Sequence, residues 1–571
     1  MRAMFRNKIY LAYFILLLVT CTILVFTNFS YDAEYQISMA YRLLNGDDLI
    51  TQMWEPHQTS AFLCAFVMKF YMTITRTTTG IIIFVQLMGL LLRALISFYV
   101  FYTVKQLIGQ YSALVSGILY LLLSPKDLLV PEFSNMQLWF STLTALTIIQ
   151  YFHSKRTLFL VLSGISFCFG VFSYPSFILA YPAICYLLFR YSQQFKKAFG
   201  IFTGICVLIG GSFVIYLLAK VGLPLILECV PRAFSLEPTH TVNMWEKLFS
   251  HLCDLLQIAA VLASVCFAGF VTEIVFRLLS KLAKKQVLRF SKERVLLFSW
   301  FIILAIFLID ILRAKNTGYH AYPSVWLICL GLTGRKFLSR EEQCVYDCGM
   351  FMGFANLIAT LLLSDHGALR AVPYMVTSVC FSVIPLYHLF RTHFSLPQLR
   401  KLFVWSIHLF LLLIITRCIY IHVPIYGREQ ICSLSSDLAY IRSGPAMGLI
   451  TDEAGAARQR DSMAEWKEYV RPGDTIWILG EPVDTLGYLY EDVEVGAPTV
   501  MSTPTYNENL LYYWELNPEK YPDIVILESS FGELSWVLSQ NQWLLQWLDE
   551  KYKAETVKDG NYWRYYFKES P

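Results

Sequence analysis

Long apolar runs separated by short polar segments fill residues 1–421 of this 571-residue chain. A helix that crosses a membrane needs about 20 apolar residues, with about 17 as the usual minimum. Three of the runs (110–124, 175–190 and 319–333) are short, so the expected number of spans is eleven to thirteen. The pattern predicts a polytopic α-helical membrane protein. The expected spans are 9–27, 81–104, 110–124, 135–152, 157–173, 175–190, 199–219, 252–276, 295–312, 319–333, 346–363, 371–390 and 402–421.

The pattern changes after residue 421. Thr475 to Leu479 and Asp523 to Leu527 are short apolar runs that each follow a turn sequence, which is typical of strands. Asn561 to Lys568 predicts a final strand, and helical spacing occurs near 456–470, 506–516 and 531–551. Residues 422–571 are therefore expected to form a small α/β domain, without a phosphate-binding loop or a nucleophile elbow.

Composition and charge support this division. Charged residues make up 15% of the chain, against about 25% in globular proteins, which excludes a soluble multidomain enzyme. Hydrophobic residues make up 56%, and a chain this apolar is not disordered. Residues 1–421 hold 34 Lys+Arg against 18 Asp+Glu, whereas residues 422–571 hold 12 against 24. An apolar, basic transmembrane domain thus precedes an acidic domain. The basic residues lie in short clusters between spans, so no nucleic-acid partner is expected.

The loop charges predict the orientation. With the N-terminus in the cytoplasm, the loops on that side collect 22 Lys+Arg, as expected for cytoplasmic loops. An odd number of spans then places the acidic domain outside. The cysteines mostly lie singly within apolar spans, and no disulfide framework is expected, which favours a bacterial plasma membrane over the endoplasmic reticulum.

Two outer loops, 28–80 and 220–251, are long. Within the first, residues 33–45 carry apolar side chains at helical spacing and stop at Asn45-Gly46, and residues 59–72 form a second amphipathic stretch after Pro56. Helices of this kind lie in the membrane interface. They indicate a site at the outer membrane surface.

The first loop also gathers titratable residues. Asp32 and Glu34 directly follow the first span, and His57 lies in Trp54-Glu-Pro-His-Gln58 between the two expected helices. This combination suits a general base with an optional divalent metal ion. The alternative for Asp32 is an N-cap of the following helix, and the alternative for Glu34 and His57 is solvation at the interface.

Two further groups lie at outer ends of spans. Asp127 and Glu132, with Lys126, follow the third span and form a second acidic group, for which a solvated turn is the alternative. Cations of the later outer loops could hold a lipid phosphate through charge-assisted hydrogen bonds, or could be snorkelling anchors. These later residues are Arg313, Lys315, His320, His366 and Arg370.

The layout resembles the GT-C superfamily of membrane glycosyltransferases, in particular the branch with protein O-mannosyltransferases and the aminoarabinose transferase of lipid A. The similarity covers spans one to six, and beyond them it is one of topology. The residues that carry it are Asp32-Ala-Glu-Tyr35, Ala40-Tyr-Arg-Leu-Leu-Asn-Gly-Asp47, Trp54-Glu-Pro-His57, Leu92-Arg93-Ala94, Tyr102-Thr-Val-Lys-Gln-Leu-Ile-Gly109 and Leu121-Leu-Leu-Ser-Pro125.

The resemblance implies an inverting transfer of a sugar from a polyprenyl-phosphate donor to an extracytoplasmic glycan, lipid or protein. It implies that Asp32 is the base, with Glu34 as the near alternative, and that outer-loop cations hold the donor phosphate. The sequence departs from the family in three places. An alanine separates Asp32 from Glu34, Asn135 stands where a carboxylate is common, and Ser173-Tyr-Pro-Ser176 lacks the usual lysine.

A transporter or lipid flippase of the cell envelope is the alternative, and an inactive assembly or sensor subunit is a third. Transporters favour charges near the membrane midplane and internal repeats. Here Glu273, Asp310 and Arg417 lie toward the ends of spans, and no repeat relates the two halves of the chain. The sequence therefore favours the transferase.

Overall fold

The computed structural model describes most of the chain. The described residues are 2–27, 29, 31–123, 125, 129–236, 244–283, 289–312, 321–363, 367–393, 397–420, 438–479, 482–503, 505–528, 541–552 and 554–568.

Every expected span coincides with a helix. The short expected span at 175–190 is a 3₁₀ turn, η2, followed by α8, and the expected span at 371–390 is likewise broken by a 3₁₀ turn, η5. The helices of this body are α1 (Arg2–Thr27), α4 (Ile81–Leu107), α5 (Gln110–Leu122), α6 (Phe133–Ser154), α7 (Leu158–Ser173), η2 (Pro175–Leu179), α8 (Ala180–Tyr191), α9 (Phe195–Lys220), α11 (Met244–Leu282), α12 (Lys292–Leu312), α13 (Ala321–Gly334), α14 (Arg340–Leu363), α15 (Ala368–Ala371), η5 (Val372–Met375), α16 (Val376–His393) and α17 (Pro397–Tyr420).

Several of these helices are long and apolar enough to cross a membrane. Four described helices meet that requirement alone, namely Ile81–Leu107, Phe195–Lys220, Trp245–Leu282 and Arg340–Leu362. A fifth results if the bent pair of α1 and the following helix is one span. The number of spans therefore stays a prediction, while the polytopic helical architecture is present.

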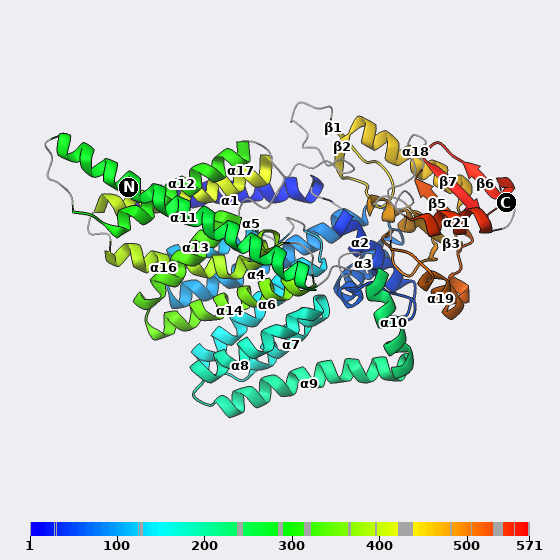
Figure 1. Ribbon diagram of the computed structural model, residues 1–571, viewed down its shortest axis with the longest axis horizontal. Coiled ribbons are helices and arrows are strands. Elements are labelled where there is room, and N and C mark those ends of the chain that lie inside the picture. Colours follow the sequence, from blue (N-terminus) through cyan, green and yellow to red (C-terminus); the bar gives the residue numbers. More distant parts are fainter. Residues whose placement is uncertain are drawn as a thin grey trace.

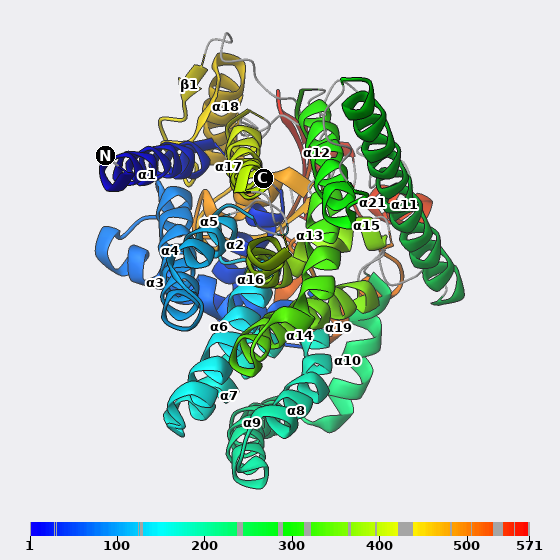
Figure 2. The same cartoon turned by 90° about the vertical axis from the view of Figure 1, so that its left-hand side faces the viewer.

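The edge of the helical body exposes apolar side chains. On α9, Val207 and Ile215 are 66% and 67% exposed, and this helix lies at the periphery of the bundle, as does α11, whereas α16 lies near the middle (Figure 2). Monomeric soluble proteins rarely leave apolar patches of this extent in water. Such a surface suits contact with lipid, and the chain is an integral membrane protein.

The long loops contain helices on the side of the body where the C-terminal domain lies, here called the domain side. The first loop forms α2 (Tyr31–Leu44), η1 (Gln58–Ser60) and α3 (Ala61–Thr75), which confirms both helices expected there. The backbone of Gly46 has a φ of 101°, a left-handed conformation that favours glycine just beyond a helix end. The second long loop forms α10 (Leu223–Leu236).

The C-terminal domain is built on a mixed sheet with the strand order β4-β3-β5-β7-β6. β3 runs parallel to β4 and β5, and β7 runs antiparallel to β5 and β6. The two apolar runs and the final strand expected from the sequence are confirmed as β3, β5 and β7. The elements are β1 (Leu438–Tyr440), β2 (Ile450–Asp452), α18 (Glu453–Tyr469), β3 (Thr475–Leu479), η6 (Pro482–Leu489), β4 (Glu494–Val495), α19 (Asn509–Leu516), η7 (Pro518–Lys520), β5 (Ile524–Glu528), α21 (Gln542–Lys551), η8 (Ala554–Thr556), β6 (Val557–Asp559) and β7 (Trp563–Phe567).

The C-terminal domain lies at the opposite end of the molecule from the start of α1 (Figure 1). It packs on α2 through η6, where the Ser38 hydroxyl donates a hydrogen bond to the carbonyl of Thr485 at 2.9 Å. The backbone N–H of Trp54 donates to the carbonyl of Pro498 at 2.8 Å. The Thr59 hydroxyl donates a hydrogen bond to the carbonyl of Phe172 on α7. The first long loop thus lies between the helical body and the C-terminal domain and is hydrogen-bonded to both.

Candidate functional site

A cavity of about 950 Å³ lies between α7, α8, α9 and α10, and we call it the α7–α10 groove. Its walls are mostly apolar side chains from these helices. Phe167 and Phe172 come from α7, Phe213 and Leu217 from α9, and Phe234 from α10. An apolar cavity of this size, bordered by helices with lipid-facing surfaces, has the character of a site for a hydrocarbon chain.

The end of the groove on the domain side is formed by the first loop. Leu49, Ile50, Pro56 and Thr59 line it, together with Glu55 and Gln58. The Oε1 atom of Gln58 accepts a hydrogen bond from the backbone N–H of Ile50 at 2.8 Å. The groove therefore changes from apolar along the helices to polar at the loop.

Glu55 is a fully buried carboxylate at this polar end. Its Oε1 accepts hydrogen bonds from the backbone N–H of Val500 at 3.0 Å and from Nη1 of Arg42 at 3.3 Å. No described residue hydrogen-bonds its Oε2. Burial raises the pKa of Glu55 above the ordinary value of 4.5, and Arg42 and backbone N–H groups oppose that rise. One oxygen is thus held, and the other is a buried acceptor without a hydrogen-bond partner among the described residues.

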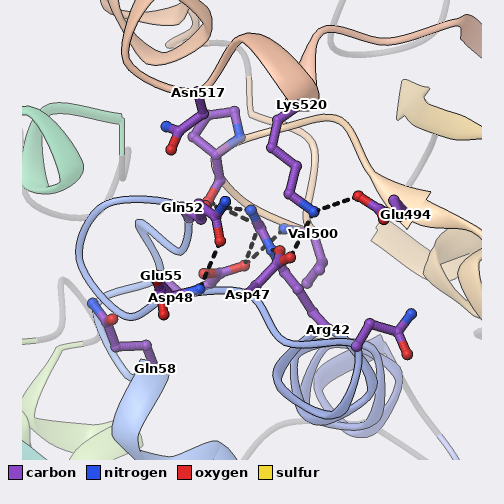
Figure 3. A network of polar contacts seen from close by, with 12 residues as sticks. Arg42, Asp47, Asp48, Gln52, Glu55, Gln58, Glu494, Val500, Asn517 and Lys520 are labelled. Atoms are coloured by element: carbon purple, nitrogen blue, oxygen red, sulfur yellow. Dashed lines mark hydrogen bonds and ion pairs between the residues drawn. The ribbon is translucent and has the colours of Figure 1, made fainter. Parts of the chain in front are cut away.

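Arg42 is the centre of a buried network of charges between the first loop and the C-terminal domain (Figure 3). Arg42 is 1% exposed. Its guanidinium donates hydrogen bonds to Asp47, to the carbonyls of Gln52 and Pro498, and to the hydroxyl of Tyr513. Burial lowers the pKa of Arg42, but Tyr513 and the two carboxylates outweigh it and raise the pKa overall.

Lys520 connects the same network to the sheet. Its Nζ lies 2.7 Å from Oδ1 of Asp47 and 2.9 Å from Oε2 of Glu494 (Figure 3). The network contains two cations, Arg42 and Lys520, and the three carboxylates Asp47, Glu55 and Glu494. These five side chains join the first loop to the sheet of the C-terminal domain.

The first turn of α2 holds the two carboxylates expected to act. Asp32 lies inside that turn and is half-buried. The alternative role as the N-cap of this helix is therefore wrong, because the helix begins at Tyr31. A carboxylate in the first turn still interacts favourably with the helix dipole. Glu34 is 1% exposed. The alternative in which Glu34 is a solvated interfacial residue is therefore wrong.

His57 and Glu132 meet the first turn of α2 around Phe133. The His57 ring stacks on Phe133, with centroids 4.4 Å apart, and on Tyr174, with centroids 4.9 Å apart, while Tyr35 contacts Phe133 edge-on at 6.4 Å. The interfacial solvation considered as the alternative for His57 does not describe a ring that packs against two aromatic side chains.

Glu132 is fully buried and caps α6. Its carboxylate accepts hydrogen bonds from the backbone N–H groups of Ser134 at 2.9 Å and Asn135 at 2.7 Å. The solvated turn considered for this group is therefore wrong for Glu132, because the side chain satisfies N–H groups that the helix start leaves open. The cap fixes the start of α6, and with it the ring of Phe133 against His57.

The remaining site residues expected from the sequence cannot be placed against this geometry. Asp127, Arg313, Lys315, His320 and His366 lie outside the described residues, and the backbone of Arg370 belongs to α15. In the described part of the chain, no three His, Cys, Asp or Glu side chains are grouped so that they could hold a metal ion.

Glu55, Arg42 and Lys520 were not expected from the sequence as site residues. Glu55 lies inside the motif that drew attention to His57, but its partner Val500 is 445 positions away. A carboxylate two positions before His57 in the same short motif is a signal that could have been followed. No local pattern, by contrast, points to Lys520.

No family model matches the chain, and no curated protein matches it in sequence. Among solved structures, ArnT from Cupriavidus metallidurans in the apo state aligns at a TM-score of 0.47 and 10% identity, over 100% of this chain and 99% of that one. The same ArnT bound to undecaprenyl phosphate aligns at 0.46 and 10%, over 99% and 98%. The archaeal oligosaccharyltransferase AglB from Archaeoglobus fulgidus, in complex with an inhibitory peptide and a dolichol-phosphate, aligns at 0.43 and 10%, over 92% and 70%.

ArnT and AglB are both membrane glycosyltransferases of the class that the sequence resembles. At identities and TM-scores this low, the overall likeness assigns no activity to the chain. The case for a function rests on the groove and on the residues at its polar end.

Proposed function

We propose that this protein is an integral membrane glycosyltransferase that transfers a sugar from a polyprenyl-phosphate donor to an extracytoplasmic acceptor. The observation that carries the proposal is the α7–α10 groove, which is apolar between the helices and ends at buried polar groups of the first loop. A lipid-linked sugar has the same division, with a hydrocarbon tail and a polar headgroup. The sequence resemblance points to the same donor class.

The division of the groove explains how one protein would use such a donor. The tail would pack against the apolar side chains between α7 and α9, away from water. The headgroup would then lie beside the loop that carries the carboxylates. The predicted orientation places this loop and the C-terminal domain outside the cytoplasm. We therefore expect the protein in a bacterial plasma membrane, acting on its outer face.

In the proposed reaction an acceptor hydroxyl attacks the anomeric carbon of the donor. The new bond joins the acceptor oxygen to that carbon, the bond to the phosphate oxygen breaks, and the polyprenyl phosphate leaves with the electron pair. The hydroxyl proton passes to a carboxylate, for which Asp32 is the first candidate and Glu34 the second. Inversion follows from a single displacement. Cations of the later outer loops would stabilise the phosphate as its charge develops.

A comparison of the native protein with Asp32→Asn in liposomes tests the proposal. Polyprenyl-phosphate hexoses and pentoses serve as donors and a cell-envelope extract serves as acceptor. We expect sugar transfer by the native protein and its loss in the variant, with folding and topology unchanged. Equal transfer by both proteins would remove Asp32 as the base and make Glu34 the next candidate.

Transfer of no sugar by the native protein, with any of these donors, would contradict the proposed function. If the protein nevertheless bound the lipids, a lipid flippase would become the better explanation of the groove. That outcome would be recognised by movement of the labelled lipid between leaflets without any change in its headgroup.

A further inference from the structure

Resting on the proposed function, we propose that Glu55 and Gln58 form the sugar subsite of the α7–α10 groove. The Glu55 carboxylate accepts a hydrogen bond from a hydroxyl of the donor sugar, and the Gln58 amide donates one. The backbone of Val500 in the C-terminal domain holds Glu55 in position for this contact.

Glu55 differs from every other described residue of the groove lining because it carries a charge. The groove otherwise contains aliphatic and aromatic groups with a few hydroxyls, thiols and the Gln58 amide. A carboxylate repels a phosphate and is a good acceptor for sugar hydroxyls. Glu55 therefore marks the place of the sugar, and the donor phosphate belongs at some distance from it.

The two oxygens of Glu55 have different surroundings. Oε1 is held by the N–H of Val500 at 3.0 Å and by Arg42 at 3.3 Å, whereas Oε2 is buried and has no hydrogen-bond partner among the described residues. A buried acceptor without a hydrogen-bond partner is unfavourable, because it has lost its contact with water and gained no replacement. A sugar hydroxyl that reaches Oε2 would remove that cost, so the empty acceptor favours a hydroxyl-bearing ligand.

Gln58 supplies the complementary group. Because its Oε1 accepts from the N–H of Ile50 at 2.8 Å, the orientation of its amide is fixed and its Nε2 is the donor that remains. Both residues line the same end of the groove, three positions apart in the chain. Neighbouring sugar hydroxyls each donate and accept a hydrogen bond, so an acceptor beside a donor matches their pattern.

The C-terminal domain controls the position of Glu55. Val500 belongs to that domain and bonds the carboxylate directly, and Lys520 reaches the same network through Asp47 at 2.7 Å. Trp54, the residue before Glu55, is bonded by its backbone N–H to Pro498 at 2.8 Å. A shift of the C-terminal domain would therefore turn Glu55 away from the groove.

Lipid binding to the full-length protein in nanodiscs tests the subsite. The probes are polyprenyl phosphates that bear one hexose or pentose, and the same polyprenyl phosphate without a sugar. We expect Glu55→Ala to weaken binding of a sugar-bearing lipid about ten-fold, which corresponds to a loss of about 1.4 kcal/mol, and to leave the bare lipid unaffected. Gln58→Ala should give a smaller loss of the same kind. Asp48→Asn is the matched control, since Asp48 lies in the same loop and pairs with exposed Lys220 at 3.2 Å.

Equal binding of the sugar-bearing lipid by native protein and Glu55→Ala would overturn the subsite, and so would an equal loss for both lipids. In either case binding of the bare lipid by the native protein would leave the proposed function standing. A native protein that binds neither lipid would overturn both. These outcomes separate the two proposals.

The positioning role has its own pair of variants. Val500→Pro removes the N–H that holds Glu55, whereas Val500→Ala keeps it. We expect Val500→Pro to raise KM for the sugar-bearing donor with a smaller change in kcat, and Val500→Ala to resemble the native protein. Thermal unfolding of both variants reports whether the fold is retained. Unchanged KM in a folded Val500→Pro protein would overturn the role of the C-terminal domain.

Discussion

The first loop carries carboxylates in two regions, and different parts of the molecule hold these two regions in place. In the first turn of α2 lie half-buried Asp32 and buried Glu34, and the adjacent Tyr35 and His57 both contact Phe133 at the start of α6. At the polar end of the groove, Glu55 is held by Arg42 and by Val500 of the C-terminal domain. In the first region His57 packs on Phe133 at the start of α6 and on Tyr174 after α7, whereas in the second region a residue of the C-terminal domain holds Glu55.

This difference suggests a division of tasks. A general base must reach the acceptor, which suits the more accessible Asp32, whereas a residue that fixes a sugar must itself be fixed, which suits Glu55. The predictions below separate the two regions, because a variant of one should leave the other intact.

Arg42→Ala should have the largest effect. It leaves the carboxylate of Glu55 buried without its cation and leaves Asp47 with Lys520 alone, and removal of one partner from a buried ion pair costs about 3–5 kcal/mol. We expect a large loss of thermal stability and rapid proteolysis between the helical body and the C-terminal domain. Lys467→Ala is the control, because exposed Lys467 pairs with Glu491 at 3.6 Å. An ion pair at the surface contributes about 0–1 kcal/mol to the free energy of unfolding. Equal stability of the two variants would contradict a domain junction held by Arg42.

His57→Ala should come next, and it affects the first region. The substitution removes stacking on Phe133 and Tyr174, and each aromatic pair contributes about 0.5–1.5 kcal/mol beyond the burial of area. Thermal unfolding should show this loss, and His57→Phe should restore it. If His57→Phe is stable but inactive in sugar transfer, the imidazole has a chemical role. If it is fully active, His57 serves packing alone.

Glu132→Ala should destabilise the protein by about 1 kcal/mol, since it removes the cap from two backbone N–H groups of α6. The start of α6 then frays, and Phe133 loses its fixed place against His57. Hydrogen exchange of the Ser134 and Asn135 amides measures this directly. Unchanged protection of both amides would show that the cap contributes nothing to the first region.

Glu55→Gln should have the smallest effect on stability, but the effect depends on pH. Burial raises the pKa of Glu55 above 4.5 in the folded state, so the folded protein keeps a proton that the unfolded chain releases. The contribution is fully present below 4.5 and is lost as the pH rises through the folded-state pKa. The stability of native protein should therefore fall relative to Glu55→Gln as the pH rises from 4.5 through the raised folded-state pKa of Glu55. Parallel pH profiles of the two proteins would contradict this shift.

The sequence predicted the features that depend on local pattern. Each expected span is found as a helix, α2 ends before Gly46 as expected, and β3, β5 and β7 are found where short apolar runs follow turns. β4 and β6 have two and three residues, which is too short for a run to stand out. Their pairing is decided by the strands beside them.

The candidate site residues also divide into those that a local motif predicts and those whose role depends on a contact distant in sequence. Asp32, Glu34 and His57 could be proposed because they lie in short polar motifs next to apolar spans. The role of Glu55 depends on Val500, which follows it by 445 positions, and no spacing in a single sequence encodes such a contact. The alternatives of solvation failed for Glu34 and Glu132, which are 1% and 0% exposed, because burial depends on the folded arrangement and a local motif does not show it.

Filling the groove is the most direct test of a lipid-linked donor. Gly211 lines the groove on α9, and a Cβ added there meets no atom within 4 Å, so Gly211→Phe occupies the space without a clash at the backbone. Gly204→Phe is the matched control, because Gly204 is an exposed residue of the same helix, has equal room and does not line the groove. Sugar transfer from polyprenyl-phosphate donors should be lost in Gly211→Phe and kept in Gly204→Phe. Native-like transfer by Gly211→Phe would contradict a donor tail in this groove.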